Sequence, residues 1–226
     1  MLPRVLEPEA MDSAREAADY DAMDHAAVNA RFVADFLAAH GPCRGGAILD
    51  VGTGTARIPI ALAVADAGAL VVGADLAVAM IDLARRVVAE AGVADRVRVQ
   101  RCDAKGLPFA AGAFEAVLSN SIVHHIPEPL SALTEMARVL APGGTLLVRD
   151  LARPSTVEEV ARIVERHAGS ESPAARALFG ASLHAALTAG EVRDLVQALG
   201  LPGDGVAMTS ERHWTWTWRR PRGSAT

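Results

Sequence analysis

An apolar run that ends at a glycine-rich turn is the feature that most constrains the fold of this chain. Residues 47–57 read AILDVGTGTAR, so strand-like residues lead directly into Gly52 and Gly54. Glycine adopts backbone angles that other residues avoid, and without a Cβ it lets a ligand approach the main chain. A helix that begins after Thr55 would direct its unpaired N–H groups toward the turn. The segment therefore predicts a buried parallel strand followed by a helix beside a nucleotide-like ligand.

Strand-like and helix-like segments alternate through the middle of the chain. Strands that are mostly rich in apolar residues are expected at residues 47–51, 70–74, 97–101, 114–119 and 145–149. Helices are expected between them at residues 55–67, 77–91 and 129–140, the last closed by a turn at 141–144. Because buried parallel strands are apolar throughout and are joined by helices, this alternation predicts an α/β fold with both faces of the sheet covered.

Further helix-like segments flank this region, and they are expected at residues 12–39, 155–167 and 173–187. Thr188 and Glu191 form a capping-box pattern that begins another helix, which ends near Gly200. Residues 205–210 and 213–219 follow as strand-like segments, the second with a period of two. We therefore expect a seven-stranded, mostly parallel sheet with an antiparallel terminal hairpin.

The surplus helices predict the domain organisation. A plain alternating fold would place one helix between the fifth strand and the hairpin, so the extra length is interpreted as a lid over the ligand. We expect an N-terminal helical lid at residues 1–44 and a main domain at 45–226. The lid insertion within the main domain is expected at about residues 154–187.

Composition argues against several classes of partner. The 226 residues carry a net charge of −5, and Lys105 is the only lysine, so no basic stripe is available to follow a phosphate backbone. The cluster of Arg219, Arg220 and Arg222 is interpreted as a solvated end of the chain. We expect no nucleic-acid partner.

Cysteine usage and hydropathy give expectations for compartment and membrane contact. Cys43 and Cys102 form neither a disulfide framework nor a zinc-binding spacing. Residues 1–20 lack the apolar stretch of a signal peptide, and no apolar run reaches membrane-spanning length. We therefore expect a cytoplasmic protein without a membrane partner.

The residues around the glycine turn discriminate between nucleotide-like ligands. A dinucleotide fold favours G-x-G-x-x-G, but Arg57 occupies the third glycine position here. Asp50 would repel a pyrophosphate and would attract a ligand that carries an ammonium group. The pattern D-x-G-x-G-T-A resembles motif I of the class I S-adenosylmethionine-dependent methyltransferases, with Ala56 at the family's usual third glycine.

Three downstream segments strengthen the resemblance, which covers about residues 45–150. Residues 102–104 (CDA) are similar to the family's next motif. Residues 106–109 (GLPF) and 114–120 (FEAVLSN) resemble its L-P-F…F-D-x-V-x-S-N stretch, with Glu115 in place of the usual aspartate. Residues 136–144 (MARVLAPGG) match its helix-to-strand segment.

The resemblance implies a Rossmann-like fold that binds S-adenosylmethionine at the carboxyl ends of the strands. It implies the cofactor-binding residues Asp50, Gly52, Thr53, Gly54, Asp75, Leu76, Met80, Asp103, Ala104 and Asn120. The loop 50–54 would hold the methionine end, and Asp75 would accept hydrogen bonds from the ribose hydroxyls. Asp103 would accept from the adenine amino group beside the backbone of Ala104, and Asn120 would lie near the methionine ammonium. Leu76 and Met80 would pack on the adenine face.

Candidates for a catalytic base follow the fourth strand. His124 and His125 are adjacent, and neighbouring side chains rarely point the same way, so they are not expected to act as a pair. An imidazole titrates near working pH. We interpret His124 as facing the acceptor and His125 as structural, and the alternative is that both only pack and orient the loop.

Substrate contacts are expected from the N-terminal lid and from the end of the fifth strand. Tyr20 and His25 lie in the expected N-terminal lid. Arg149 and Asp150 end the fifth strand, where Arg149 would either anchor an acceptor carboxylate or belong to an internal ion pair. No metal site is expected, because Asn120 stands where a metal-binding methyltransferase would need an acid.

Together these features predict methyl transfer from S-adenosylmethionine to a small-molecule acceptor. The nucleic-acid signature D/N-P-P-Y/F is absent from residues 119–122. Two alternatives stay open: a non-catalytic S-adenosylmethionine-binding scaffold, and an NAD-dependent oxidoreductase of similar fold. Arg57 and the lack of a Tyr-x-x-x-Lys motif argue against the oxidoreductase. The sequence does not identify the acceptor, the type of acceptor atom that receives the methyl group (O, N, S or C), or the oligomeric state.

Overall fold

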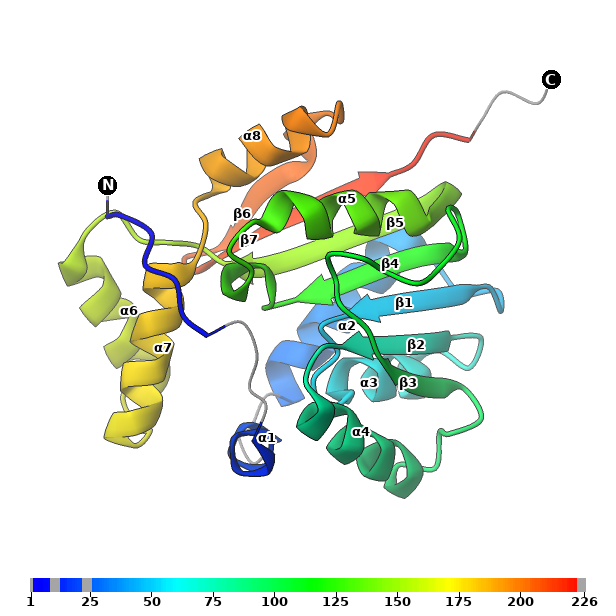
Figure 1. The fold of residues 1–226 in the computed structure, drawn as a ribbon, viewed down its shortest axis with the longest axis horizontal. Coiled ribbons are helices and arrows are strands. Elements are labelled where there is room, and N and C mark those ends of the chain that lie inside the picture. Colours follow the sequence, from blue (N-terminus) through cyan, green and yellow to red (C-terminus); the bar gives the residue numbers. More distant parts are fainter. Residues whose placement is uncertain (1, 9–12, 22–25, 223–226) are drawn as a thin grey trace. The chain divides into compact units, whose positions relative to one another are not determined.

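The computed structural model describes residues 2–8, 13–21 and 26–222. Hydrogen bonding orders seven strands as β3-β2-β1-β4-β5-β7-β6 (Figure 1). Strand pairs β1/β2, β1/β4 and β2/β3 are parallel, whereas β6/β7 is antiparallel. The predicted α/β fold, with its mostly parallel seven-stranded sheet and antiparallel terminal hairpin, is therefore confirmed.

The chain divides into two compact units. The larger unit comprises residues 10–120, 131–148 and 217–226, and the smaller unit comprises residues 1–9, 121–130 and 149–216. The larger unit contains α1 (Ala14–Asp21), α2 (Ala26–His40), β1 (Ala47–Val51), α3 (Arg57–Ala65), β2 (Leu70–Asp75), α4 (Val78–Glu90), β3 (Val97–Arg101) and β4 (Phe114–Asn120). The smaller unit contains η1 (Val123–His125), α6 (Val157–Ala168), α7 (Pro173–Ala185), α8 (Ala189–Ala198), η2 (Gly203–Gly205) and β6 (Val206–Ser210). The chain passes between the units within α5 (Pro129–Val139), β5 (Leu140–Leu151) and β7 (His213–Arg219).

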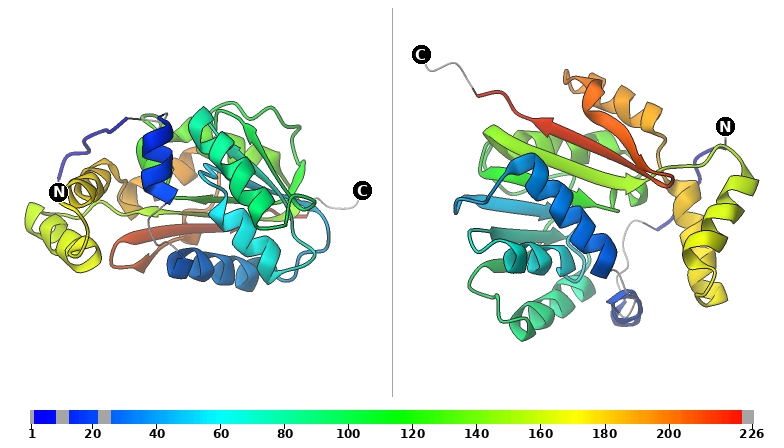
Figure 2. Two further views of the ribbon diagram at one scale, coloured as in Figure 1. Left: turned by 90° about the horizontal axis from the view of Figure 1, so that it is seen from below. Right: turned by 180° about the vertical axis from the view of Figure 1, so that it is seen from behind.

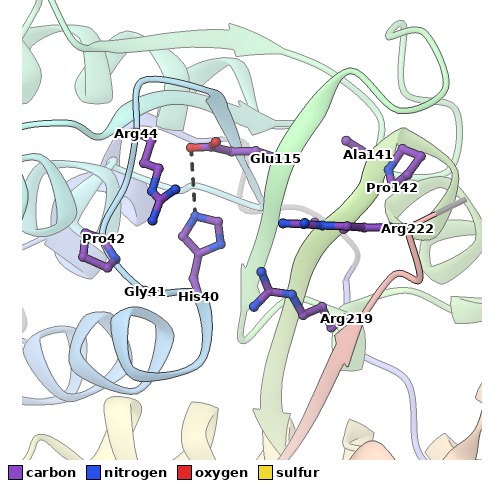
Figure 3. A pocket seen from close by; sticks show the side chains of 11 residues that line it. His40, Gly41, Pro42, Arg44, Glu115, Ala141, Pro142, Arg219 and Arg222 are labelled. Carbon is purple, nitrogen blue, oxygen red and sulfur yellow. Dashed lines mark ion pairs between the residues drawn. The ribbon is translucent and has the colours of Figure 1, made fainter. Parts of the chain in front are cut away.

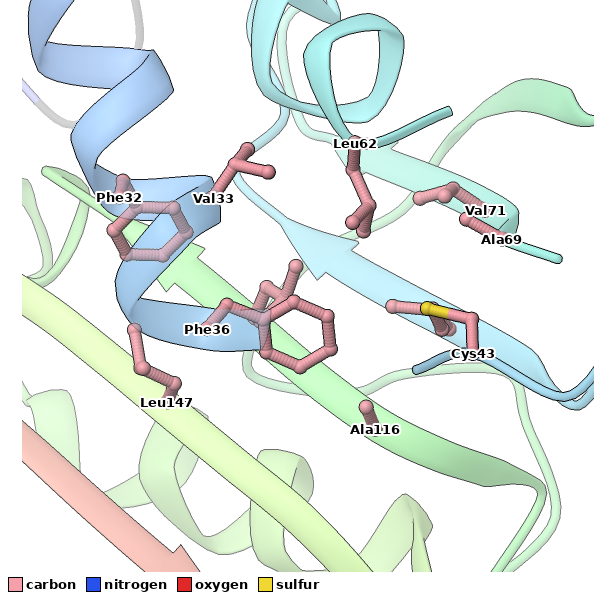
Figure 4. Packing of buried hydrophobic residues seen from close by; sticks show 11 residues of the cluster. Phe32, Val33, Phe36, Cys43, Leu62, Ala69, Val71, Ala116 and Leu147 are labelled. Carbon is pink, nitrogen blue, oxygen red and sulfur yellow. The ribbon is translucent and has the colours of Figure 1, made fainter. Parts of the chain in front are cut away.

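Helices cover both faces of the sheet in the larger unit. Figure 2 (right) shows α2 lying across one face, whereas Figure 1 shows α5 on the other. From α2, Phe32 and Phe36 are fully buried against Ile48 of β1 and Ala116 of β4 (Figure 4). Burying an aromatic or aliphatic side chain contributes about 1.5–3 kcal/mol each. This packing covers β1, which lies between β2 and β4 and whose register sets Leu49 opposite Val72 and Val117.

Two element boundaries differ from the sequence-based expectation. The helix expected at 12–39 is described as α1 and α2, and residues 22–25 between them lie outside the described ranges. The turn expected at 141–144 is wrong, because β5 already begins at Leu140. Gly143 (φ 78°) donates its N–H to Arg220 O at 2.9 Å, and Arg220 N donates to Gly144 O at 3.0 Å. A long-range partner therefore converts a turn-like sequence into paired strand.

In the smaller unit, α6 and α7 pack through Val160, Ile163 and Leu183. The capping box predicted for α8 is present: Thr188 Oγ1 accepts from Glu191 N at 3.2 Å, and Glu191 Oε2 accepts from Thr188 N at 2.7 Å. Within residues 2–8, 13–21 and 26–222, we find no helix with the length and apolarity needed to cross a bilayer.

Removing the Thr188 cap is expected to weaken the fold. Thr188→Ala leaves the N–H of Glu191 without its side-chain acceptor, so we expect the free energy of unfolding to fall by about 1 kcal/mol. Urea unfolding followed by circular dichroism would measure the change. Thr188→Ser keeps a hydroxyl in the same place and serves as the matched control. Equal losses in both variants would show that the cap hydroxyl is not the cause.

Candidate functional site

The glycine turn after β1 folds back over β2. Gly52 and Thr53 donate their N–H groups to Ala74 O at 2.7 and 3.0 Å. Gly52 has φ 76° and Gly54 has φ 53°, in the region where glycine carries no Cβ penalty. A Cβ at Gly73 would lie 2.7 Å from Thr53 Oγ1, so this glycine lets the turn approach β2 closely. The sequence reasoning missed Gly73, and only its position opposite Asp50 in the strand register could have indicated it.

Asp50 lies at the base of the turn and is almost completely buried, with 1% of its surface exposed. Burial raises the pKa of its carboxyl to about 7; the nearby charge of Asp75 adds to the increase, and the hydrogen bond from Thr53 opposes it. Thr53 Oγ1 donates to Asp50 Oδ2 at 2.7 Å. The carboxyl can therefore change its charge near neutral pH when a cation is placed beside it.

Asp75 connects the glycine turn to the beginning of α4. Its carboxylate accepts from Gly54 N at 2.8 Å and from Ala77 N at 3.0 Å. Burial raises the pKa of Asp75, and these backbone hydrogen bonds act against the increase. The backbone N–H of Leu76 also acts on this carboxylate as a hydrogen-bond donor. A carboxylate offers about four acceptor positions, so about one stays available, and the side chain is only partly buried. Asp75 can thus organise the loop and still accept from a diol.

The other predicted cofactor-binding residues follow neighbouring strand ends of the larger unit. Because β3, β2, β1 and β4 are adjacent and parallel, their carboxyl ends meet at one edge of the sheet. Asp103 is partly exposed after β3, where its Oδ1 accepts from Lys105 N at 2.9 Å and lies 3.0 Å from Lys105 Nζ. Ala104 is half-buried beside it, and Asn120 is half-buried at the end of β4.

The two residues predicted to pack on adenine differ in exposure. Leu76 is half-buried directly after β2. Met80 is only 5% exposed and belongs to an apolar cluster with Ala17 of α1 and Ala77. Most of the Met80 side-chain surface is therefore buried against other residues of the protein. Its contact with adenine stays a prediction.

An ion pair ties α1 to the beginning of α3. Arg57 Nε and Nη2 donate to Asp21 Oδ1 and Oδ2 at 2.8 and 2.6 Å. Arg57 is the residue in the third glycine position, so the departure from the dinucleotide pattern has a local structural role. Tyr20 lies in α1, but its side chain is outside the described part, and His25 lies outside the described residues altogether.

In the smaller unit, His124 lies between two carboxylates. His124 Nδ1 is 2.5 Å from Asp150 Oδ1, and His124 Nε2 is 3.3 Å from Glu7 Oε1. The backbone N–H of His124 also donates to Asp150 Oδ2 at 3.1 Å. His124 and Asp150 are 3% and 0% exposed. The structure thus joins two predicted site residues and adds Glu7, which the sequence reasoning missed because it is distant in the chain.

The electrostatics of this cluster favour a charged imidazole at His124. Burial lowers its pKa, but the carboxylates of Asp150 and Glu7 outweigh burial, so the net pKa is raised. Burial and the neighbouring His124 charge lower the pKa of His125 to about 4. Burial raises the pKa of Glu7 despite the His124 charge. His125 is therefore neutral at physiological pH, and its Nδ1 lies 3.2 Å from Glu7 Oε1.

Arg4 holds the N-terminal segment onto this cluster. Its guanidinium donates to the carbonyl oxygens of His124, Ile126 and Ala185 at 3.0, 2.9 and 2.7 Å. These bonds keep Glu7, three residues later in the chain, beside the imidazole. Nothing in the local sequence of Arg4 indicates these long-range acceptors.

Arg149 is buried and donates through Nε to Thr215 Oγ1 at 2.9 Å. Its contact with an acceptor carboxylate stays a prediction.

Glu7, His124 and His125 offer ligand atoms within 4.8 Å of one another, which is the spacing a divalent metal ion would require. A protonated His124 between two carboxylates accounts for the same distances without a metal.

Comparison with known proteins agrees with the geometry. Residues 49–148 match a protein-family model described as Methyltransferase domain. A methyltransferase from Streptomyces halstedii, GfsG, is 36% identical over 117 residues, which cover 52% of this chain and 42% of that protein. The demethylmenaquinone methyltransferase of Thermus thermophilus is 42% identical over 107 residues, 47% of this chain and 48% of that protein. The matched region thus spans less than half the length of these relatives.

A solved structure supports the fold over a longer range. The S-adenosylmethionine-dependent methyltransferase from Aquifex aeolicus superposes with a TM-score of 0.67 at 18% identity, covering 91% of this chain and 97% of that one. At this identity the similarity concerns the fold alone.

Proposed function

We propose that this chain is an S-adenosylmethionine-dependent methyltransferase, which transfers a methyl group from S-adenosylmethionine to a small-molecule acceptor. Residues 49–148 match the Methyltransferase domain model, and the matched relatives are named as methyltransferases. The observation that carries the proposal is Asp75, which is hydrogen-bonded to Gly54 and still has acceptor capacity for a ribose diol. The cofactor supplies a methyl group activated by a sulfonium. The protein must hold the donor, align the acceptor and receive a proton.

The larger unit offers the residues that would hold the donor. We assign the backbone of Gly52, Thr53 and Gly54, with the charge of Asp50, to the methionine end. Asp75 would bind the ribose. The backbone of Ala104 and the carboxylate of Asp103 would bind adenine, with Leu76 and Met80 beside it, and Asn120 would lie near the ammonium group.

The smaller unit offers the base. We propose that His124 Nε2 receives the acceptor's proton, while Asp150 holds Nδ1–H and fixes the tautomer. Glu7 Oε1 lies 3.3 Å from Nε2, so the acceptor must displace the Glu7 carboxyl or transfer its proton through it. His125, Tyr20, His25 and Arg149 stay candidates for acceptor contacts.

A small acceptor that loses a proton fits the composition and the proposed base. The net charge of −5 and the single lysine disfavour a polyanionic substrate. As the methyl–sulfur bond breaks, its electrons stay on sulfur. The acceptor's electron pair forms the new bond to carbon, and its proton passes to His124. A hydroxyl group or an acidic carbon meets this requirement, and one of the matched relatives is named for demethylmenaquinone.

Calorimetry and a transfer assay test the proposal against its alternatives. We expect S-adenosylhomocysteine to bind and NAD not to bind. Isotope-labelled methyl groups should move from S-adenosylmethionine to at least one member of a panel of phenols, enols and quinols. Binding of NAD alone would favour the oxidoreductase. Binding of S-adenosylhomocysteine without transfer across the panel would favour the scaffold.

Cofactor binding is expected to release a proton from Asp50. With a pKa of about 7 the carboxyl is mostly protonated at pH 6, and a neighbouring ammonium favours its ionised form. The affinity for S-adenosylhomocysteine should therefore increase as the pH rises from 5.5 to about 7 and then level off. Calorimetry at pH 6 in two buffers of different ionisation enthalpy would measure the proton release. Asp50→Asn should abolish that release, and an unchanged release in this variant would contradict the assignment.

A further inference from the structure

A cavity lies at the amino edge of the sheet in the larger unit (Figure 3). Its volume is about 330 Å³, which is within the range of about 300–1,000 Å³ typical of small-molecule sites. Glu115 at the beginning of β4 and residues 141–144 at the beginning of β5 form part of its wall. The predicted cofactor-binding acids follow the carboxyl ends of the strands, so this cavity is at the opposite edge.

Positive charge dominates the wall of this cavity. Figure 3 shows the guanidinium groups of Arg44, Arg219 and Arg222 directed into the space beside His40. Within the described ranges, these guanidinium groups form no hydrogen bond or ion pair. Glu115 is the only acid among the lining residues, and its Oε1 is buried without a hydrogen bond, 3.9 Å from His40 Nε2. The cavity therefore has an excess of positive charge.

The backbone near the end of the described chain positions two of these arginines. Arg220 is anchored by its backbone pairing with 143–144, and its Nη1 donates to Leu140 O at 2.6 Å. A Cβ at Gly143 would lie 3.0 Å from Arg222 Cγ, so the Arg222 stem rests against this glycine. Arg219 and Arg222 are exposed, as expected for a solvated end of the chain, whereas Arg220 is half-buried and anchored. Arg220 serves as an anchor, and Arg219 and Arg222 face the cavity.

We propose that this cavity binds a small molecule through a phosphate or pyrophosphate group held by Arg44, Arg219 and Arg222. A guanidinium presents a planar set of donors that fits phosphate oxygens in pairs, and such charge-assisted hydrogen bonds are stronger than neutral ones. The hollow is partly open, and its volume of about 330 Å³ accommodates a small ligand. The site does not depend on the proposed methyl transfer.

Inorganic pyrophosphate is the probe for this site. The test variant is Arg44→Gln/Arg222→Gln, since both positions lie outside the strands. The matched control is Arg86→Gln/Arg98→Gln, which removes the same charge from exposed positions of the larger unit. Calorimetry at low ionic strength should show saturable binding to the wild type and the control, and at least tenfold weaker binding to the test variant. S-adenosylhomocysteine should bind all three proteins equally.

The His40 imidazole provides a local measurement. A bound anion favours the charged form of a neighbouring histidine, so NMR titration should show a higher His40 pKa with pyrophosphate in the wild type and the control only. The proposal is overturned by non-saturable binding to the wild type, by equal binding to the test variant, or by competition with S-adenosylhomocysteine. Binding of polyglutamate in place of pyrophosphate would also overturn it, in favour of a protein partner.

Discussion

Asp75→Ala is expected to weaken the binding of S-adenosylhomocysteine markedly. The ribose loses a hydrogen bond to a charged acceptor, and such a bond contributes about 1.5–3 kcal/mol. Since 1.4 kcal/mol corresponds to a factor of ten in affinity, the loss amounts to about tenfold to about a hundredfold. Calorimetry measures the dissociation constant directly. An unchanged constant would remove Asp75 from the ribose site.

Two further variants separate ribose binding from loop structure. Asp75 also accepts the N–H groups of Gly54 and Ala77, so its removal can loosen the glycine turn. Asp75→Asn keeps one oxygen acceptor for the turn but loses the charge, and we expect an intermediate affinity. Asp82→Ala removes an exposed carboxylate from α4 and should bind like the wild type. Equal weakening in all three variants would indicate an effect of net charge.

His124→Ala is expected to slow turnover by about 10²–10⁴-fold, the usual contribution of a positioned general base. The affinity for S-adenosylhomocysteine should change by less than about twofold, because the variant retains every residue assigned to the donor. Steady-state kinetics with an acceptor from the panel, together with calorimetry, separates the two effects. Full activity in the variant would show that His124 is not the base and only packs and orients the loop.

The pH profile and two neighbouring variants sharpen this test. His124→Ala leaves Asp150 and Glu7 without their buried partner, so unfolding must be measured in parallel, with His124→Gln as a milder replacement. The rate should rise with pH through the raised pKa of His124. Asp150→Asn removes the carboxylate that favours the charged imidazole, so the rise should shift to lower pH. His125→Ala should retain most activity.

A chelator tests the alternative that the cluster binds a metal ion. Loss of activity when a chelator is added would indicate a metal at Glu7, His124 and His125.

Local patterns predicted much of the fold. The strands expected at 47–51 and 97–101 match β1 and β3, because their short length and the turn signals around them favour strands over helices. The capping box at Thr188 was readable because both of its partners lie within three residues. Boundaries failed where the partner was distant, as at 141–144, whose pairing residue Arg220 is near the end of the chain.

The candidate site was also predictable only where the relevant residues are close in sequence. The glycine turn and the acids at the carboxyl ends of β1, β2 and β3 were predictable, because parallel strands bring their carboxyl ends to one edge of the sheet. The hydrogen-bond and ion-pair partners of the site residues were not predictable from the sequence. Asp75 binding to Gly54, and Glu7 beside His124, join segments whose sequences carry no sign of each other.

The sequence by itself determined the order of strands and helices, the glycine turn and the acids at the strand ends, since these depend on periodicity and on the backbone freedom of glycine. Only the tertiary structure decided which charges meet. It pairs Arg57 with Asp21, encloses His124 between Asp150 and Glu7, and directs Arg44, Arg219 and Arg222 into one cavity. Electrostatic effects depend on distance and burial, and both are set by chain segments that are remote in sequence.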